Sequence, residues 1–207
     1  MQNYDYFGWS FKQEVNIEGG KNNDPNDLGN KDGNFTYMGL SSYWNPEIKT
    51  IINLPKEERL RKIREIYYVK YWQKVATPIM SLVSKLRDRE QNAMLKHLTF
   101  IMFDAAVQYA PKDANKLLQK AINRIVENES KYLDYRGIKI LEVDGIIGNK
   151  TILALLKWLK YGIIDSYLYL RGIKYMHLIG AKHSQAENAN GWANRLEKID
   201  NLIKGDR

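Results

Sequence analysis

The sequence predicts a mainly α fold of the α+β class, in which helices pack around one central apolar helix and a small β-hairpin follows the first helix. Three observations indicate this fold. Apolar residues recur with the 3.6-residue period of helices through most of the chain. Residues 93–109 are apolar nearly all round, as in a helix buried on every side. Residues 35–39 alternate as in a short strand.

The first helix is predicted over residues 4–17, and it ends beside a carboxylate. Its apolar face has the spacing i, i+4, i+8, occupied by Phe7, Phe11 and Val15. Gly19 and Gly20 end the helix because glycine adopts the left-handed cap conformation without steric cost, so Glu18 falls in the last turn. A charge is disfavoured there, since the C-terminal end of a helix is already negative and partial burial adds to the cost. Both effects favour the protonated form that a general acid needs.

A turn-rich segment with two more carboxylates follows this helix, and a hairpin is predicted after it. Asp24 and Asp27 lie among Asn, Pro and Gly residues, whose backbone preferences favour tight turns. The alternation over residues 35–39 then indicates a short hairpin strand. The Trp-Asn-Pro sequence at residues 44–46 ends it.

A long helix is predicted over residues 55–75, because Pro55 suits the first turn of a helix and apolar residues with helical spacing follow it. One side of this helix is an aromatic stripe made by Tyr67, Tyr68, Tyr71 and Trp72. The stripe has two interpretations. Its rings line a glycan groove and stack on sugar rings, or they pack in the core, as aromatic residues at helical spacing more often do.

The middle of the chain leads into the predicted central helix. Residues 78–86 are predicted to form a short helix and residues 87–92 a charged connector to the apolar helix 93–109. Asp104 is a carboxylate on that apolar helix. It is either a second acid in a cleft or a hydrogen-bonded residue that serves the fold, and the second role is the commoner one for a carboxylate in such a place.

Four further helices are predicted in the C-terminal half, over residues 111–126, 152–161, 162–179 and from about residue 185, with residues 132–140 as loop or short strand. Before the second of them, Gly145 and Gly148 supply a turn with positive φ, in which Asp144 can hydrogen-bond its own backbone. Thr151 is the predicted N-cap of that helix. Trp192 on the last helix either stacks on a sugar or caps the core.

The composition excludes several kinds of catalytic chemistry. The chain has 207 residues and no cysteine, which excludes a thiol nucleophile and a fold held by disulfides. Its three histidines stand in no His-x-His or His-Glu-x-x-His pattern, so we expect no metal site, and we expect no cofactor. The absence of Gly-x-Ser-x-Gly argues against a serine triad. Carboxylate chemistry remains, which is the chemistry of glycosidases.

The net charge of +8 is compatible with binding to polyanions, of which nucleic acid and the bacterial cell wall are two candidates. The basic residues are spread along helices and no nucleic-acid-binding signature is present, so we expect no nucleic-acid partner. No run of 18 apolar residues is found, so we expect no transmembrane helix. Residues 1–5 lack the basic and apolar regions of a signal peptide.

Ordered motifs run along the chain. In the first half these are Glu-Gly-Gly, Asp-Pro-x-Asp-x-Gly and Thr-x-x-Gly, at residues 18–20, 24–29 and 36–39. Farther on are a Phe-Asp-containing segment, an Asp-Gly-x-x-Gly-x-x-Thr signature and a Gly-Trp-x-Asn-Arg motif, at residues 102–107, 144–151 and 191–195. Together they resemble glycoside hydrolase family 108, bacterial and phage N-acetylmuramidases of lysozyme-like fold. The signature at 144–151 resembles that of peptidoglycan-binding modules.

The chain departs from the family pattern at two places. Asn30 stands where a second glycine is usual, and residues 31–35 look like a short insertion. The resemblance implies a lysozyme-like catalytic region over residues 1–92. It also implies a helical region over residues 93–207 that carries the peptidoglycan-binding motif and packs with the first as one globule.

The resemblance implies that Glu18 is the catalytic acid, which protonates the glycosidic oxygen. Asp27, nine residues on, and Thr36 would stabilise the oxocarbenium-like transition state or orient the attacking water. By analogy with phage-type lysozymes we expect inversion, which needs two carboxyl groups about 6.5–9.5 Å apart rather than about 5–5.5 Å. Further substrate contacts are expected from Asp24, Tyr37, Tyr71, Trp72, Trp192 and Arg195.

The implied function is that of a lysozyme- or endolysin-like N-acetylmuramidase, which hydrolyses the β-1,4 bond between N-acetylmuramic acid and N-acetylglucosamine in peptidoglycan. The alternative is a non-catalytic peptidoglycan-binding or secretion-accessory protein on the same fold. In both cases the expected partner is the peptidoglycan glycan strand. We expect synthesis in the bacterial cytoplasm without a signal peptide, and access to the wall through a holin or secretion machinery.

Overall fold

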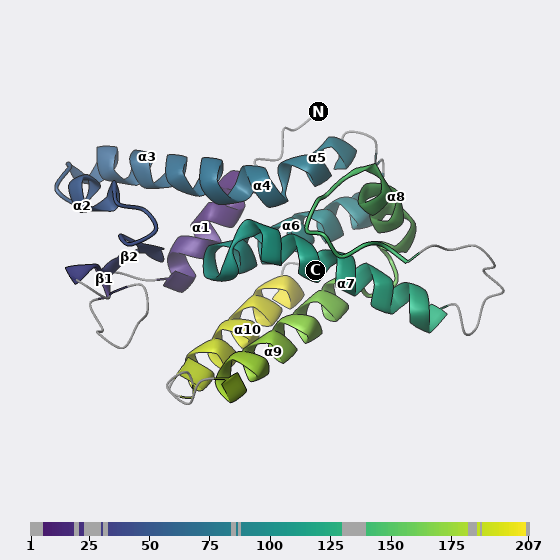
Figure 1. Ribbon diagram of the computed structural model, residues 1–207. Helices are drawn as coiled ribbons and strands as arrows, with labels where there is room; N and C mark the ends of the chain where they lie inside the picture. The colour runs from purple at the N-terminus through teal and green to yellow at the C-terminus, as the bar shows by residue number, and fades with distance from the viewer. Residues whose placement is uncertain are drawn as a thin grey trace. The chain divides into compact units, whose positions relative to one another are not determined.

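The computed structural model describes most of the chain, namely residues 6–18, 21–22, 30, 33–83, 86, 88–129, 140–181, 186 and 188–205. It divides into two compact units, Met1–Trp72 and Gln73–Arg207. The fold is mainly α, as predicted, and all the strands that the structure describes lie in the first unit (Figure 1). The division predicted from the sequence, with a boundary at residue 92, stays a prediction.

The first unit combines helices with a small sheet. Its elements are α1 (Tyr6–Glu18), β1 (Lys21–Asn22), β2 (Thr36–Tyr37), β3 (Leu40–Ser41), α2 (Ile48–Ile51), α3 (Lys56–Ile66) and the π-helix η2 (Tyr67–Trp72). The helix α1 ends at Glu18, as the glycine pair after it predicts. Phe11 of α1 packs edge-on against Tyr67, with ring centroids 5.5 Å apart, so α1 and η2 share one aromatic core.

The sheet is antiparallel, with the strand order β1-β2-β3. The predicted hairpin is formed by β2 and β3, in which Tyr37 is paired with Leu40. Met38 and Gly39 form its two-residue turn, and both have positive φ, 49° and 77°. A turn with two positive φ angles matches the right-handed twist of paired strands, but a methionine in that conformation is uncommon. The strand β1 was not predicted, because two polar residues carry no alternating pattern.

The predicted helix over residues 55–75 changes its winding in the middle. The segment α3 is α-helical and η2 is π-helical. The short helix α4 (Gln73–Val75), which belongs to the second unit, is α-helical again. A π-helical turn contains more residues than an α-helical turn, so it changes which aromatic side chains point into the core. Tyr67 and Trp72 are buried, whereas Tyr68 is 38% exposed. Short π-helical segments are rare and are frequently found at functional sites.

The second unit is a helical bundle, made by α4, α5 (Thr77–Val83), α6 (Arg89–Tyr109), α7 (Pro111–Glu129), α8 (Asn149–Trp158), α9 (Ile163–Ala181) and α10 (Ala189–Gly205). The predicted central helix is α6, which packs against α4, α5, α7 and α9. All its residues from Leu98 to Ala106 are buried, which agrees with its nearly continuous apolar surface. Figure 1 shows α9 and α10 side by side, and the two helices are in contact.

Three predicted helix starts were wrong, among them that of the last helix, which was expected from about residue 185 and begins as α10 at Ala189. The charged residues before Ala93 are not a connector, because α6 begins at Arg89 and Asp88 caps it by accepting a hydrogen bond from the backbone N–H of Glu90 at 2.9 Å. Acidic residues are favourable in a first turn, so a charged stretch is compatible with a helix start. The helix α8 begins at Asn149 with Gly148 at the N-cap, rather than with Thr151.

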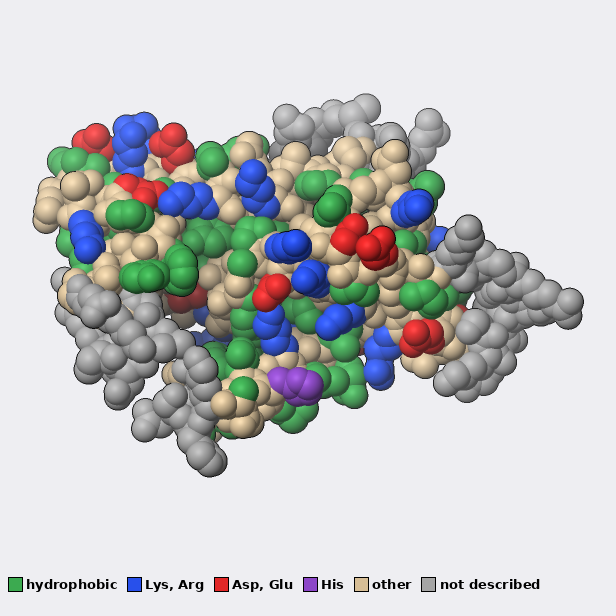
Figure 2. Space-filling model, in the orientation of Figure 1, with side chains coloured by type: hydrophobic (Ala, Val, Ile, Leu, Met, Phe, Trp, Pro, Cys, Tyr) green, Lys and Arg blue, Asp and Glu red, His purple; other side chains and the backbone are tan. Residues whose placement is uncertain are grey.

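The charges of the chain are mixed over the surface in view. Figure 2 shows basic side chains lying among acidic ones across this face, over several helices. In the part of the chain that the structure describes, we find no helix that is both long and apolar enough to cross a membrane.

Asp104 joins three helices of the second unit through buried ion pairs. Its carboxylate pairs with Arg171 of α9 and accepts a 2.9 Å hydrogen bond from Nε of Arg195 of α10. Asp104 and Arg171 are fully buried. Burial opposes the charge, but the two guanidinium groups outweigh it and hold the pKa of Asp104 below its ordinary value. The contacts support the structural role of Asp104 among the two that the sequence left open.

The glycine-containing motif before α8 is a turn fastened to α7. Asp144 accepts a 2.7 Å hydrogen bond from Nε2 of Gln119, and the backbone N–H of Gly145 donates to Oε1 of the same side chain at 2.8 Å. A Cβ atom on Gly145 would lie 2.8 Å from the carbonyl oxygen of Lys112, and φ is +81° there. Glycine is therefore needed at 145 both for its backbone conformation and for space.

We expect Gly145→Ala to lower the free energy of unfolding by about 2–4 kcal/mol, because strain at positive φ adds to a clash with backbone. Gly148→Ala is the matched control, since φ is −93° there and nothing lies within 4 Å of the added carbon. Its cost should stay below about 1 kcal/mol. Urea denaturation of both variants measures the difference, and equal losses would contradict the tight packing at 145.

We expect Asp104→Asn to lower the free energy of unfolding at neutral pH by about 3–5 kcal/mol, because two buried arginines lose their counter-charge. The control is Asp113→Asn, which removes a half-exposed pair with Lys174 and should cost about 1 kcal/mol or less. Urea denaturation at neutral pH compares them.

The pH dependence of stability provides a second readout for Asp104→Asn. Because the pKa of Asp104 is depressed in the folded protein, its contribution is present above its ordinary pKa of 3.8 and is lost as the pH falls through the lower folded value. Asp104→Asn should therefore lose less stability on acidification than the wild type. An unchanged acid dependence would contradict the assignment.

Candidate active site at the end of the first helix

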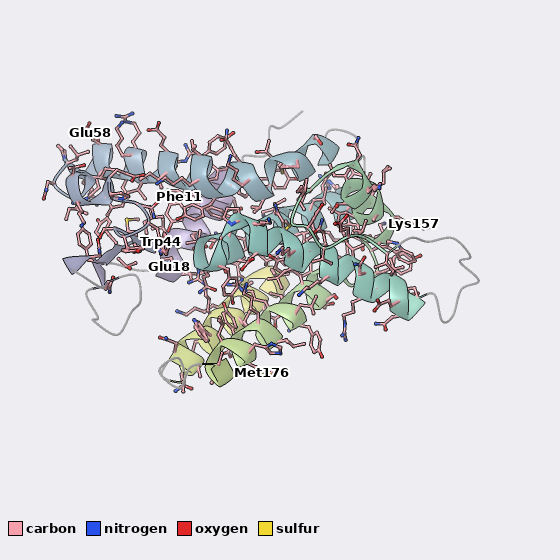
Figure 3. All side chains as sticks on the ribbon, in the orientation of Figure 1. Phe11, Glu18, Trp44, Glu58, Lys157 and Met176 are labelled. Carbon is pink, nitrogen blue, oxygen red and sulfur yellow. The ribbon has the colours of Figure 1, made fainter. Side chains whose placement is uncertain are left out.

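Glu18 is half-buried at the last residue of α1, and its side chain lies against the β2–β3 turn (Figure 3). A Cβ atom built on Gly39 would lie 2.6 Å from both Cγ and Cδ of Glu18. The same point is 2.8 Å from the hydroxyl oxygen of Tyr67. The carboxyl group therefore rests on the bare backbone of Gly39, with the tyrosine hydroxyl as its neighbour.

The turn that confines Glu18 is held in place by a residue of the π-helix η2. Tyr67 is fully buried and donates a hydrogen bond to the carbonyl oxygen of Met38. This bond fixes the turn residue whose φ is unfavourable for a side chain. Since Tyr67 also packs on Phe11 of α1, one ring positions the helix that carries the acid and the turn that contacts it. We call Met38, Gly39 and Tyr67 the Glu18 cradle.

Thr36 lies on the strand that leads into the cradle. It is paired with Asn22 of β1 and with Ser41 of β3. Its hydroxyl donates a 3.0 Å hydrogen bond to Oδ1 of Asn30, which is buried. Asn30, where the chain departs from the family pattern, thus orients the hydroxyl of a predicted catalytic residue.

Two of the predicted acidic site residues, Asp24 and Asp27, lie outside the described residues. The separation between the carboxyl groups of Glu18 and Asp27 decides between inversion and retention. Our expectation of inversion therefore stays a prediction, as do the roles of Asp24 and Asp27.

The predicted aromatic contacts of the first unit differ in their exposure. Tyr37 is half-buried, with the guanidinium group of Arg59 5.7 Å from its ring centroid. Tyr71 is half-buried and accepts a 3.3 Å hydrogen bond from Nδ2 of Asn45. Burial raises the pKa of the Tyr71 hydroxyl above its ordinary value. Trp72 is only 4% exposed and packs against Phe7, in the core rather than at the surface.

The predicted contacts of the second unit are both engaged by other side chains. Trp192 is half-buried and stacks on Tyr175, with ring centroids 4.9 Å apart and planes at 13°. Arg195 is buried and bound to Asp104. An ion pair with a buried carboxylate accounts for Arg195 without a substrate.

Sequence reasoning missed most of the cradle. Gly39 belongs to the Thr-x-x-Gly motif. The motif alone does not reveal that the lack of a side chain at Gly39 makes room for the carboxyl group of Glu18. Tyr67 is one of four aromatic residues within the six residues Tyr67–Trp72, and only the winding of η2 distinguishes it. Asn30 could be noticed only as a departure from the pattern.

Two family models match successive parts of the chain. Residues 11–109 match the family model described as Glycosyl hydrolase 108, and residues 113–197 match the model described as Predicted Peptidoglycan domain. The solved structure of SagA from Brucella abortus is similar in fold, with a TM-score of 0.62 and 24% identity over 96% of this chain and 94% of that chain. No curated protein sequence matches the chain significantly.

Proposed function

We propose that this chain, in which residues 11–109 match the glycosyl hydrolase 108 family model, is an N-acetylmuramidase with Glu18 as the general acid. The family and the peptidoglycan domain that follows make it a glycosidase that acts on peptidoglycan. The finer proposal is that it hydrolyses the β-1,4 bond between N-acetylmuramic acid and N-acetylglucosamine.

The observation that carries the proposal is the confinement of Glu18. A general acid must be held at one place relative to the leaving oxygen, since proton transfer requires a short hydrogen bond. The cradle supplies that restraint through a fully buried tyrosine and a turn without a side chain at the point of contact. A carboxyl group on a rigid helix end, supported by fixed neighbours, is the arrangement that preorganised sites use.

In the proposed reaction Glu18 donates its proton to the glycosidic oxygen as the bond to the anomeric carbon breaks, and positive charge develops on the sugar ring. Asp27 stabilises that charge or activates water. Thr36 supports the second half of the reaction. Its hydroxyl proton is donated to Asn30, so the lone pairs of its oxygen are available to accept a hydrogen bond from the attacking water.

The substrate contacts that we propose are those with accessible side chains. Tyr37 and Tyr71 in the first unit and Trp192 in the second unit remain in the proposal, together with Asp24. Trp72 and Arg195 are left out because each is buried among residues that account for it. Passage to the wall through a holin or secretion machinery also remains a proposal.

A second candidate function is that of a non-catalytic wall-binding or secretion-accessory protein. Such a protein has no need for an acid or for a restraint on it. The chain retains Glu18, and the cradle holds the carboxyl group in contact with Gly39. This arrangement favours the enzyme over the accessory protein.

We expect Glu18→Gln to lower peptidoglycan hydrolysis by about 10²–10⁴-fold, because the amide cannot donate a catalytic proton. Glu58→Gln, on the exposed side of α3, is the control and should keep full activity. Turbidity loss of purified peptidoglycan gives the rate, and new reducing ends on N-acetylmuramic acid identify the bond. Full activity of a folded Glu18→Gln protein would exclude this mechanism.

We expect Gly39→Ala to lower hydrolysis about 100-fold, because the added methyl group displaces the carboxyl group of Glu18. Gly33→Ala is a matched control: φ is +75° there, compared with +77° at Gly39, but nothing lies within 4 Å of the added carbon. Both variants carry about 1–2 kcal/mol of backbone strain. Only Gly39→Ala should lose activity, and similar activities of the two would refute the cradle.

A further inference from the structure

Two large aromatic side chains stand exposed directly after β3. Trp44 is 71% exposed and Tyr43 is 51% exposed. Their rings meet edge to face, with centroids 4.6 Å apart and an interplanar angle of 84°. Single exposed apolar residues are ordinary on protein surfaces, but an exposed indole braced by a second ring is a preformed flat surface.

The backbone under this aromatic pair is firmly held. The amide N–H of Tyr43 donates to Oγ of Ser41 at 3.1 Å, and that of Asn45 donates to the carbonyl oxygen of Ser41 at 2.9 Å. The Asn45 side chain is buried and is bound by Tyr71 and by Lys70. Trp44 is therefore projected from a rigid turn while contributing little to the core. Its exposure is not a consequence of a loose loop.

The aromatic pair follows the hairpin whose turn, Met38 and Gly39, belongs to the Glu18 cradle. The turn at Gly39 contacts Glu18, and β3 consists of the two residues Leu40 and Ser41. Strand geometry places Ser41, at the end of β3, about 7 Å from Gly39, and Trp44 follows three residues later. To reach Trp44, a glycan strand bound at Glu18 would have to extend along the hairpin beyond Ser41.

We propose that Trp44, braced by Tyr43, is a stacking platform for a pyranose ring of the glycan strand on which Glu18 acts. The proposal rests on the proposed function for the identity of the ligand. One face of a pyranose ring presents C–H bonds, whose positive ends complement the negative face of an indole. Stacking there would fix the strand at a second point and so hold the scissile bond in place at the acid.

The charges near the platform favour a sugar over a polyanion. Lys70 is close by, but its ammonium group is bound to the carboxylate of Glu47 at 2.7 Å and to Asn45 at 3.0 Å. Aromatic platforms for nucleic acids are combined with unpaired basic groups that follow the backbone. Lys70, a nearby cation among the residues that the structure describes, is already neutralised, so the platform suits the uncharged face of a pyranose.

The test measures binding separately from hydrolysis. In a Glu18→Gln background, which leaves the substrate intact, Trp44→Ala and Trp44→Phe are titrated calorimetrically with a soluble, peptide-free tetrasaccharide of alternating N-acetylglucosamine and N-acetylmuramic acid. Tyr161→Ala is the control, because Tyr161 is also exposed, at 47%, and also meets a neighbouring ring, that of Trp158, edge to face. Thermal unfolding of each variant verifies that it is folded.

We expect Trp44→Ala to weaken binding about tenfold, Trp44→Phe to lose less, and Tyr161→Ala to bind like the parent, with the Tm of Trp44→Ala unchanged. In the otherwise wild-type enzyme, Trp44→Ala should raise KM more than it lowers kcat. Equal binding by Trp44→Ala and the parent, or no binding by the parent, would overturn the platform.

The proposed function and the platform fail in different ways. If the wild-type protein has no hydrolytic activity but its binding still depends on Trp44, the muramidase assignment is refuted and the platform is retained. If the wild-type protein is fully active and Trp44→Ala leaves binding unchanged, only the platform is refuted.

Discussion

The hydrogen bond from Tyr67 to the carbonyl oxygen of Met38 is the contact on which the candidate active site depends. It holds a turn in a conformation that methionine avoids, and that turn brings the backbone of Gly39 against Glu18. The same ring packs on Phe11, in the helix that carries the acid. The buried Tyr67 side chain thus contacts both the helix that carries Glu18 and the turn that lies against it. Neither the helix nor the turn can shift alone without breaking one of these contacts.

Local signals predicted the parts of the fold that depend on neighbours in the chain. The end of α1 at Glu18 follows from two glycines, and the burial of α6 follows from its continuous apolar surface. Non-local effects account for what was missed. The two residues of β1 form a strand only because Thr36 and Tyr37 lie beside them. The ion pair between Asp104 and Arg195 joins residues 91 positions apart, which no periodicity reveals.

The candidate site divides in a similar way. Sequence motifs selected Glu18 and Thr36, because residue type and spacing carry their proposed chemistry. Gly39 contributes only the space that a side chain would otherwise fill. That contribution can be recognised only in the three-dimensional structure, where the Glu18 side chain occupies the space. Asn30 was seen as a departure from a pattern, yet it orients the hydroxyl of Thr36. Trp44 was seen as the end of a strand, while its exposure depends on how the turn after β3 is held.

The π-helical winding of η2 has a consequence for how sequences of this kind are aligned. A π-helical segment contains more residues per turn than an α-helix, so it acts as an insertion hidden inside a helix that remains continuous. In a relative whose corresponding helix is purely α, each residue turns the side chains by about 100°. An alignment drawn without a gap through Tyr67–Trp72 and anchored on the preceding helix would then pair the residues after the π-helical turn with residues on a different side of the relative's helix.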